Sequence, residues 1–363
     1  MRLLAQATSL LALSTLRAFP QQPVVIPQPP PSVSIPAGFI LGADVSYLRD
    51  LESKGVAFQD EGQPHPGLDI LRHHGYNWVR LRIMNEPTPL PNTLAYTLAE
   101  AKTAKAMGFR LLLDFHYSDD WADPAHEKTP AAWSKMSHDA LVKAVFNFTR
   151  DTVTAFREQG TMPDMVQIGN EVTSGMLWPD GKLPDRWPQF AELVASGVRG
   201  VQAAKGDLPR PAIMIHIDQG GNEETTKWFF DNLLVNHVPF DVIGQSYYPW
   251  WQGSLKELKD NLAYMANRYK RPIILVETAY DWREGEVFKQ GKPPFPQTPE
   301  GQAEFFASVI SAVQQTPNGL GKGIFWWEPM SPGAIAKRGM FDDQHTALPV
   351  LRVTDPASAS PIR

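Results

Sequence analysis

The feature that most constrains the fold of this sequence is a short apolar segment that recurs eight times, separated by stretches with helical periodicity. The segments are Phe39–Asp44, Trp78–Ile83, Arg110–His116, Met165–Asn170, Ala212–His216, Asp241–Ser246, Ile273–Glu277 and Gly323–Glu328. Runs of β-branched and aliphatic residues are typical of strands buried on both faces, as in a parallel sheet. Helical periodicity marks stretches between them such as Thr97–Met107, His138–Gln159 and Gln302–Gln315. This alternation predicts an α/β protein with a single (β/α)8 TIM barrel.

A doubly wound open sheet is the competing α/β architecture. It would call for a glycine-rich phosphate turn after the first strand, and residues 42–46 (Gly-Ala-Asp-Val-Ser) do not supply one. The ends of the segments favour the barrel, because nearly all of them finish in polar, ionisable or aromatic residues. These are Asp44, Arg82, His116, Asn170, Glu171, His216, Tyr247, Tyr248, Glu277, Trp327 and Glu328. The C-terminal strand ends of a TIM barrel form its active-site face, so the pattern predicts a site there.

The N-terminus has a different composition from the rest of the chain. Residues 1–19 contain Arg2 and a short apolar stretch typical of a secretory signal peptide, although a disordered tail is the alternative. Residues 20–36 form a Pro-rich tract that predicts a disordered, extended linker. We therefore expect a catalytic barrel over 37–353, a C-terminal tail over 354–363, and a secreted or periplasmic location.

Bulk composition argues against several classes of partner. The net charge is -5 and no Lys/Arg block stands out, so nucleic-acid binding has no electrostatic footprint. No segment is apolar and long enough to predict a membrane span. Cysteine is absent from the sequence, which excludes disulfides and thiolate metal sites. We expect a monomer that acts on a polysaccharide without a metal or other cofactor.

Two glutamates at strand ends predict the chemistry. Glu171 follows the fourth segment and Glu277 ends the seventh, so they face one another across the mouth of the barrel. Cleavage of a glycosidic bond needs two carboxyl groups, one to protonate the leaving oxygen and one to attack or to activate water. The pair therefore predicts a glycoside hydrolase, although a single strand-end glutamate is more often structural.

Other strand-end residues fit a sugar site. Arg80 and Arg82 lie on one face of their strand, because side chains alternate, and one of them aimed at Glu277 would keep that carboxylate ionised. Asp114 and His116 likewise lie on one face; the alternative for both pairs is a buried network without a ligand role. Tryptophans at or near strand ends offer flat faces for sugar rings, or simply pack in the protein. They are Trp121, Trp178, Trp250, Trp251 and Trp327.

Competing chemistries lack their motifs. A metallohydrolase barrel would use a His pair or carboxylate cluster at the first strand, whereas Phe39–Asp44 has no His pair and His116 and His216 are isolated. The sequence contains no Gly-x-Ser-x-Gly motif for a serine hydrolase. Phosphate-binding glycines after the last two strands are also missing, which argues against a phosphosugar enzyme.

Longer motifs resemble family 53 of the glycoside hydrolases, the endo-β-1,4-galactanases, within a larger clan of retaining barrels that includes cellulases and mannanases. The matching stretches are Gly42–Tyr47, Val79–Arg82, Asp114–Pro124, Gln167–Glu171, Ser246–Pro249, Val276–Tyr280 and Trp327–Pro329. They occur in order and span the whole barrel. The Asn-Glu pair and the late glutamate indicate only the clan, whereas Asp114–Pro124 together with Ser246–Pro249 is more specific to the galactanases.

The resemblance implies a role for each matching residue. Glu171 would be the acid/base and Glu277 the nucleophile in retaining hydrolysis of the β-1,4-galactan side chains of pectin. Asn170 would bind the hydroxyl next to the anomeric carbon, Arg80 and Tyr248 would orient the nucleophile, and Trp327 would lie under the sugar at the cleavage point. The other residues expected to bind substrate are Asp44, Asp114, His116, Trp121, His216 and Trp250.

The clan also implies a cis peptide between Trp327 and Glu328, a strained geometry tolerated at active sites. The stretch Met330–Arg338 is short and has no cluster of oxygen ligands, so the calcium-binding loop of some relatives is not expected here. Two alternatives stay open: another β-1,4-glycanase of the clan, such as a mannanase or glucanase, and a carbohydrate-binding barrel without catalysis.

Overall fold

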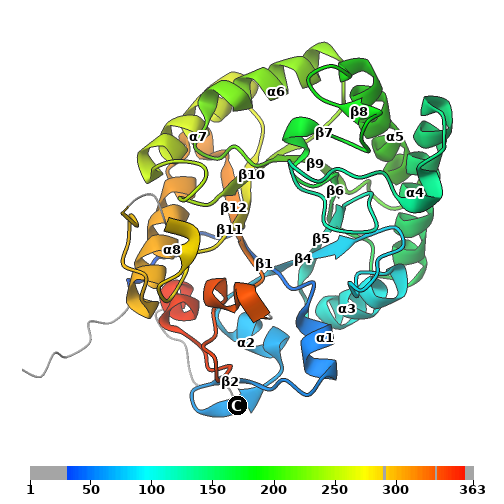
Figure 1. Ribbon diagram of the computed structural model, residues 1–363. Helices are drawn as coiled ribbons and strands as arrows, with labels where there is room; N and C mark the ends of the chain where they lie inside the picture. Colours follow the sequence, from blue (N-terminus) through cyan, green and yellow to red (C-terminus); the bar gives the residue numbers. More distant parts are fainter. Residues whose placement is uncertain (1–30, 289–291, 332, 356–363) are drawn as a thin grey trace, which may run out of the picture.

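Eight parallel strands close into a barrel with helices around it. The computed structural model describes residues 31–288, 292–331 and 333–355. The barrel order is β1-β12-β11-β10-β9-β6-β5-β4, so that each strand of the barrel pairs with its neighbour in the chain and the last pairs with the first. Figure 1 shows the helices as a ring outside the strands. The predicted TIM barrel is confirmed.

The barrel strands coincide closely with the eight apolar segments. They are β1 (Ile40–Asp44), β4 (Trp78–Ile83), β5 (Arg110–Phe115), β6 (Met165–Ile168), β9 (Ala212–Ile217), β10 (Val242–Tyr247), β11 (Ile273–Thr278) and β12 (Gly321–Trp327). Two small antiparallel hairpins lie outside the barrel. They pair β2 (Phe58–Asp60) with β3 (Gln63–His65), and β7 (Gly175–Met176) with β8 (Gly181–Lys182).

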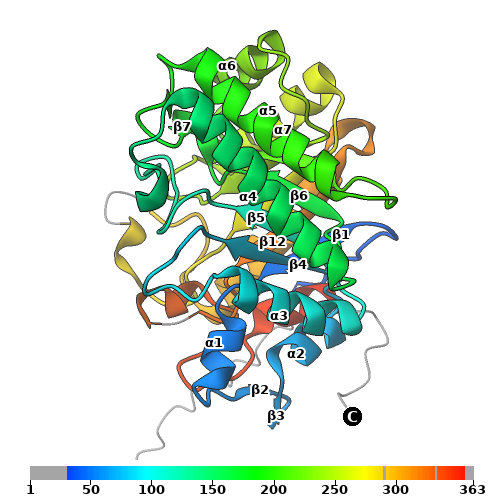
Figure 2. The same cartoon turned by 90° about the vertical axis from the view of Figure 1, so that its right-hand side faces the viewer.

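Five of the eight α-helices in the described residues begin at a side chain that caps them. The eight helices are α1 (Leu48–Ser53), α2 (Gly67–His73), α3 (Leu94–Ala106), α4 (His138–Glu158), α5 (Trp187–Ala204), α6 (Glu223–Val235), α7 (Leu255–Tyr269) and α8 (Pro299–Gln314). Of these, α1, α2 and α5 begin without a capping side chain. Ser137 caps α4, and Ser254 forms a capping box with Glu257 at the start of α7, which satisfies backbone N–H groups that have no partner within the helix. Figure 2 shows α4 and α5 side by side on the outer surface of the barrel. Short 3₁₀ turns complete the chain at Ala131–Trp133, Val172–Ser174, Glu286–Phe288, Pro317–Gly319, Gly333–Arg338 and Pro349–Thr354.

The core has two layers, one inside the barrel and one between strands and helices. The inner layer contains Ile40, Trp78, Leu112, Met165, Met214, Val242, Ile274, Val276 and Phe325. Gly42 makes room for the ring of Phe325, because a Cβ on Gly42 would lie 2.2 Å from Phe325 Cδ1. The inner layer therefore fills the barrel below its C-terminal end, the end at which the active sites of such barrels form.

Both ends of the described chain pack onto the barrel. Val33 and Ile35, in the tract expected to be a linker, pack against the outer core, and the Val33 N–H donates to the Val353 carbonyl at 2.8 Å. At the other end, the Asp355 carboxylate lies 2.5 Å from His74 Nδ1. The packed domain therefore extends beyond 37–353 in both directions. The expected signal peptide, linker residues 20–30 and tail residues 356–363 lie outside the described residues.

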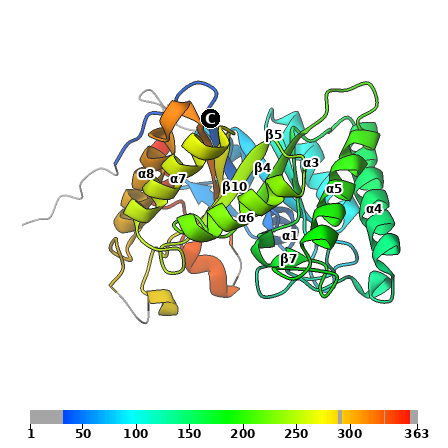
Figure 3. The same ribbon diagram turned by 90° about the horizontal axis from the view of Figure 1, so that it is seen from above.

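The loops after the strands lie together at one end of the barrel. In Figure 3, β7 lies at the lower edge of the molecule, while the blue N-terminal segment crosses the opposite edge.

Within the described ranges, none of the helices has the length and hydrophobicity needed to cross a bilayer.

Candidate active site

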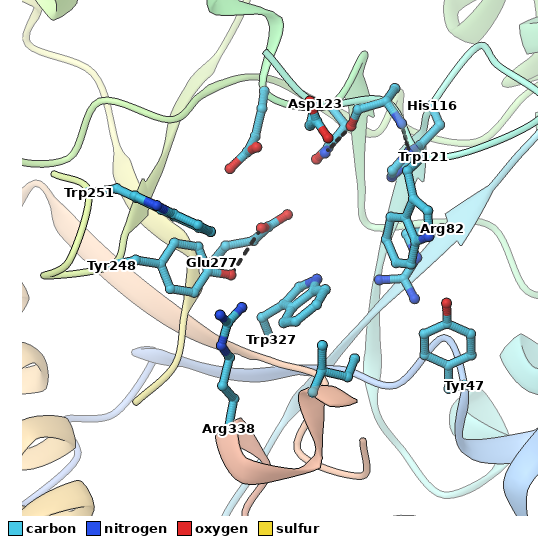
Figure 4. Close-up of a pocket in the computed structure, with 14 residues that line it drawn as sticks. Tyr47, Arg82, His116, Trp121, Asp123, Tyr248, Trp251, Glu277, Trp327 and Arg338 are labelled. Atoms are coloured by element: carbon cyan, nitrogen blue, oxygen red, sulfur yellow. Dashed lines mark hydrogen bonds between the residues drawn. The ribbon is translucent and has the colours of Figure 1, made fainter. Parts of the chain in front are cut away.

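A cavity of about 430 Å³ opens at the C-terminal end of the barrel. Figure 4 shows polar and aromatic side chains from several strand ends pointing into it. The cavity is lined by Tyr47, Arg82, His116, Trp121, Ala122, Asp123, Asn170, Glu171, Tyr248, Trp251, Glu277, Trp327, Ile335 and Arg338. The end of the barrel predicted from the sequence is thus the end that carries the cavity.

Glu171 and Glu277 face one another in this cavity. One carboxylate oxygen of Glu171, one of Glu277 and one ring nitrogen of His216 all lie within 4.8 Å of one another. Glu171 has a left-handed backbone with φ of 44°, just after Gly169 with φ of 81°. A left-handed non-glycine residue is held at a cost of about 1–3 kcal/mol, so the surrounding packing fixes the direction of this side chain.

Arg80 holds the nucleophile candidate from below. Its Nη1 donates to Glu277 Oε1 at 2.6 Å and to Asp44 Oδ2 at 2.9 Å. Its Nη2 donates to Asp114 Oδ2 and Asn170 Oδ1, both at 2.8 Å. One buried guanidinium thus joins side chains from four other positions around the barrel. The Tyr248 hydroxyl completes the setting of Glu277 by donating to Oε2 at 3.3 Å.

A different hydrogen-bond chain reaches Glu171. The Ser246 hydroxyl donates to Glu171 Oε1 at 2.6 Å, and His216 Nε2 lies 2.8 Å from Ser246 Oγ. Because the hydroxyl proton points to Glu171, His216 Nε2 carries a proton and donates it to Ser246 Oγ. The other ring nitrogen, Nδ1, accepts from the backbone N–H of Glu171 at 3.4 Å and lies 3.1 Å from Gln167 Nε2.

The two carboxyl groups differ in their tendency to hold a proton. Burial, the negative charge of Glu277 and that of Asp218 raise the pKa of Glu171 well above its usual value, against the opposing effect of the Ser246 hydroxyl. Burial also raises the pKa of Glu277, but the guanidinium of Arg80 opposes that rise through charge and a hydrogen bond. A proton shared by the pair therefore resides on Glu171, while Glu277 is the anion.

His216 is neutral in this setting. Burial and the positive charge of Arg80 lower the pKa of the imidazole well below its usual value. Both of its ring nitrogens are engaged by protein hydrogen bonds, and Glu277 is paired with Arg80. The cluster of Glu171, His216 and Glu277 is thus organised as a hydrogen-bond network rather than as three free metal ligands.

Aromatic rings form much of the remaining cavity wall. Trp327 ends β12, and its ring centroid lies 6.2 Å from that of Trp121. The Arg82 guanidinium lies 4.6 Å from the centre of the Trp121 ring and 5.1 Å from that of Tyr47. In Figure 4, Trp327 lies between Glu277 on one side and Trp121 on the other. Flat apolar faces beside two carboxyl groups suit a pyranose ring at the reacting position.

The prediction of a cis peptide between Trp327 and Glu328 is wrong for this structure. The cis bonds of the described residues precede prolines, at Thr88-Pro89, Trp178-Pro179 and Leu183-Pro184. Glu328 instead adopts a left-handed backbone with φ of 48°. This conformation lets Trp327 line the cavity while the Glu328 carboxylate turns back to the guanidinium of Arg82.

Several residues expected to bind substrate lie beneath the cavity rather than in its wall. Asp44, Arg80, Asp114 and His216 are fully buried and bond to one another or to wall residues. In the wall, Asn170 donates to the Ala122 carbonyl at 2.8 Å, and His116 Nε2 lies 3.1 Å from Asp114 Oδ2.

The loop tryptophans do not all meet at this site. Trp250 packs behind the cavity, with its ring centroid 5.2 Å from that of Tyr248, and Trp251 lines the wall instead. Trp178 lines a separate pocket and donates its indole N–H to the Ser174 carbonyl at 2.9 Å.

Sequence reasoning did not single out several contributors, among them Ser246, Asp123 and Arg338. Ser246 lies in the Ser-Tyr-Tyr-Pro stretch, and its position one residue before the end of β10 was the available signal. Asp123 lies in the long third-strand motif, which contains several acidic residues that the sequence alone does not distinguish. Arg338 lies in the 3₁₀ turn Gly333–Arg338, far from any strand end in sequence, so only the fold brings it to the cavity.

Comparison with known proteins agrees with this geometry. The sequence model described as glycosyl hydrolase family 53 matches residues 40–353. The chain is 42% identical over 308 residues to an uncharacterised protein of Niallia circulans, a match that covers 80% of this chain and 83% of that protein. It is 36% identical over 300 residues to an arabinogalactan endo-beta-1,4-galactanase of Thermothelomyces thermophilus, covering 79% and 88% of the two.

A solved structure agrees as well. The family 53 catalytic domain of Ignisphaera aggregans matches with a TM-score of 0.82 and 33% identity, covering 89% of this chain and 97% of that one. The two facing glutamates lie at the C-terminal ends of β6 and β11. Because the family model matches nearly the whole barrel, the chain belongs to glycosyl hydrolase family 53.

Proposed function

We propose that this protein hydrolyses internal β-1,4-galactosidic bonds of (arabino)galactan with retention of anomeric configuration. The observation that carries the proposal is the spacing of Glu171 and Glu277, whose carboxylate oxygens approach to within 4.8 Å. Retaining enzymes hold the two carboxyl groups roughly 5–5.5 Å apart, whereas inverting enzymes leave roughly 6.5–9.5 Å for a water molecule. The substrate follows from relatives named as arabinogalactan endo-beta-1,4-galactanases.

In the first step, Glu277 Oε2 or Oε1 attacks the anomeric carbon while protonated Glu171 donates its proton to the departing glycosidic oxygen. The bond between the anomeric carbon and that oxygen breaks, and an ester forms between the sugar and Glu277. Arg80 and Tyr248 orient the attacking carboxylate through their hydrogen bonds. Asn170, which is fixed by Arg80 and Ala122, binds the hydroxyl next to the anomeric carbon, and Trp327 packs under the ring.

In the second step, Glu171 removes a proton from water, which attacks the ester and frees Glu277. The negative charge of Glu277 is one cause of the high pKa of Glu171, and the ester removes that charge. The pKa of Glu171 therefore falls once the intermediate forms, so the same group changes from acid to base.

The test is sugar release from pectic galactan, with mannan and carboxymethyl-cellulose as comparison substrates. We expect reducing sugar from galactan alone, and β-configured reducing ends before mutarotation when the reaction is followed by proton NMR. Glu277→Ala is the control and should lower kcat by more than a thousandfold while the variant stays folded. Release from mannan or cellulose instead of galactan would overturn the substrate, and initial α-configured ends would overturn retention.

We further propose that the protein is exported and acts as a monomer, since a polymeric substrate reaches an enzyme outside the cytoplasm. Expression of the full chain in a bacterial host, followed by N-terminal sequencing and light scattering, tests this. Export predicts a mature N-terminus near residue 20 and a mass close to that of one chain. An intact Met1 in cytoplasmic protein would contradict export.

A further inference from the structure

A second cavity lies at the end of the barrel opposite the active site. It has a volume of about 520 Å³, and its lining includes Arg199, Gln202, Arg210, Phe240, Asp241 and Arg271. Arg210, Asp241 and Arg271 come shortly before β9, β10 and β11, so the cavity opens at the N-terminal ends of these strands. In Figure 2, the green loop that follows α5 projects on this side of the molecule, away from β7. We call this cavity the arginine pocket.

The charged groups of the arginine pocket do not balance. Three guanidiniums line it, those of Arg199, Arg210 and Arg271, against the single carboxylate of Asp241. Although burial raises the pKa of Asp241, hydrogen bonds and the charges of Arg210 and Arg271 outweigh burial and lower that pKa, so the carboxylate is ionised. Two positive charges remain uncompensated, in a chain whose net charge is -5. A hollow lined by charge of one sign concentrates its potential and attracts ions of the opposite sign.

Two of the three guanidiniums have donors to offer a ligand. Within residues 31–288, 292–331 and 333–355, Arg210 forms an ion pair with Asp241 at 2.8 Å, whereas Arg199 and Arg271 have no ion pair or side-chain hydrogen bond. Arg271 is nevertheless held in place, because its guanidinium lies 4.5 Å from the centre of the Phe240 ring. Stacking engages the flat face of a guanidinium and leaves the N–H groups at its edge available. Such a planar fork matches the two oxygens of a carboxylate.

The buried part of the lining is apolar. Val198, Ile213 and Phe240 are buried hydrophobic residues of the arginine pocket. An inorganic anion gains little from such a surface, whereas an acidic sugar places the C–H groups of its ring on it while its carboxylate meets the arginines. The amide of Gln202 adds a donor and an acceptor for hydroxyl groups. The pocket therefore suits a hexuronate better than phosphate or sulfate.

We infer that the arginine pocket binds hexuronate residues of the acidic backbone of pectin, the polymer whose neutral side chains the active site is proposed to cut. The choice of this polymer rests on the proposed function, whereas the affinity for an acidic sugar rests on the pocket itself. Because the pocket and the active site lie at opposite ends of the barrel, both can be occupied at once. The enzyme then stays close to further side chains after each cut, which raises their effective concentration.

The first test is calorimetric titration of the parent protein with hexagalacturonate. We expect binding that weakens as the ionic strength rises, since salt screens the attraction between exposed charges. The fully methyl-esterified hexamer has the same rings without the negative charges, and it should bind at least about tenfold more weakly. Inorganic phosphate that binds as tightly as hexagalacturonate would overturn the assignment to an acidic sugar.

The second test removes the two arginines without an ion pair. The double variant Arg199→Gln/Arg271→Gln should bind hexagalacturonate about a hundredfold more weakly, about tenfold for each guanidinium. Arg199→Glu tests the pocket without touching the contact between Arg271 and Phe240, and it should weaken binding at least as much as Arg199→Gln alone. Lys102→Gln is the matched control, because it removes a positive charge from an exposed position of α3 outside the pocket, and it should bind as the parent does.

Hydrolysis separates this inference from the proposed function. Free galactan should be cut equally well by the parent, the double variant and Lys102→Gln, whereas KM for galactan still attached to its acidic backbone should rise in the double variant alone. A parent protein that does not bind hexagalacturonate, or a double variant that binds it equally well, would overturn the arginine pocket while leaving hydrolysis untouched. A parent that leaves free galactan intact would overturn the proposed function, and the titrations would still decide whether the pocket binds an acidic sugar.

Discussion

At the scale of single residues, the pKa of Glu171 is lowered by a hydrogen-bond chain that runs from neutral His216 through Ser246 to its carboxylate. The Ser246 hydroxyl donates to the carboxylate and so stabilises its ionised form. Burial and the charge of Glu277 act in the opposite direction and outweigh it, since the pKa of Glu171 lies well above its usual value. Ser246 therefore limits how far that pKa rises.

Replacing Ser246 with Ala removes this limit, so the pKa of Glu171 rises further. The acid form then persists to higher pH, and we expect the alkaline limb of the kcat/KM profile to move to higher pH. His216 Nε2 also loses its acceptor, which should cost about 1–3 kcal/mol of stability. A pH profile of hydrolysis and a urea unfolding curve measure the two effects. Ser246→Thr keeps the hydroxyl and should leave the limb in place; movement to lower pH in Ser246→Ala would contradict the assignment.

At the scale of secondary-structure elements, the inner faces of the strands set how closely the barrel can close. Gly42 of β1 lies opposite Phe325 of β12, and the two are register partners in the parallel pair. A Cβ at residue 42 would overlap the ring of Phe325, at 2.2–2.7 Å from three of its carbons. The small residue on one strand and the large one on the next thus form a single packing unit.

Gly42→Ala should therefore lower the free energy of unfolding by about 1–3 kcal/mol, because the barrel must shift to accommodate the methyl group. Urea denaturation followed by tryptophan fluorescence measures the change. Combining it with Phe325→Leu tests the mechanism, since the smaller side chain relieves the overlap. The double variant should be less destabilised than the sum of the two single variants, and strict additivity would show that the two residues do not interact.

The barrel strands could be predicted from the sequence because burial on both faces leaves long apolar runs. Met165–Asn170, for example, contains the observed β6, Met165–Ile168. The hairpin β7–β8 escaped prediction because its strands are two residues long and depend on Gly175 and Gly181, whose backbones approach each other closely. A strand of two residues spans a single period of the side-chain alternation, so no repeating pattern can appear in it.

At the scale of the whole molecule, the site could be predicted where it depends on strand ends and not where it depends on loops. Glu171 and Glu277 follow from topology, because C-terminal strand ends meet at one end of a barrel. Trp250 and Trp251 are adjacent in sequence, yet one packs behind the cavity and the other lines it. The loop conformation that separates them depends on packing against distant segments, among them Arg338, whose guanidinium lies 4.9 Å from the Trp250 ring.

The single guanidinium of Arg80 also bears on how this lineage can change over generations. It donates hydrogen bonds to the side chains of Asp44, Asp114, Asn170 and Glu277. The group that orients the nucleophile therefore also neutralises buried carboxylates inside the barrel. A descendant that loses Glu277 leaves a buried cation with fewer counterions, and a descendant that loses Arg80 leaves several buried anions. Loss of Glu277 alone therefore ends the activity while Arg80 keeps two buried counterions, whereas loss of Arg80 puts the activity and the fold at risk in the same step.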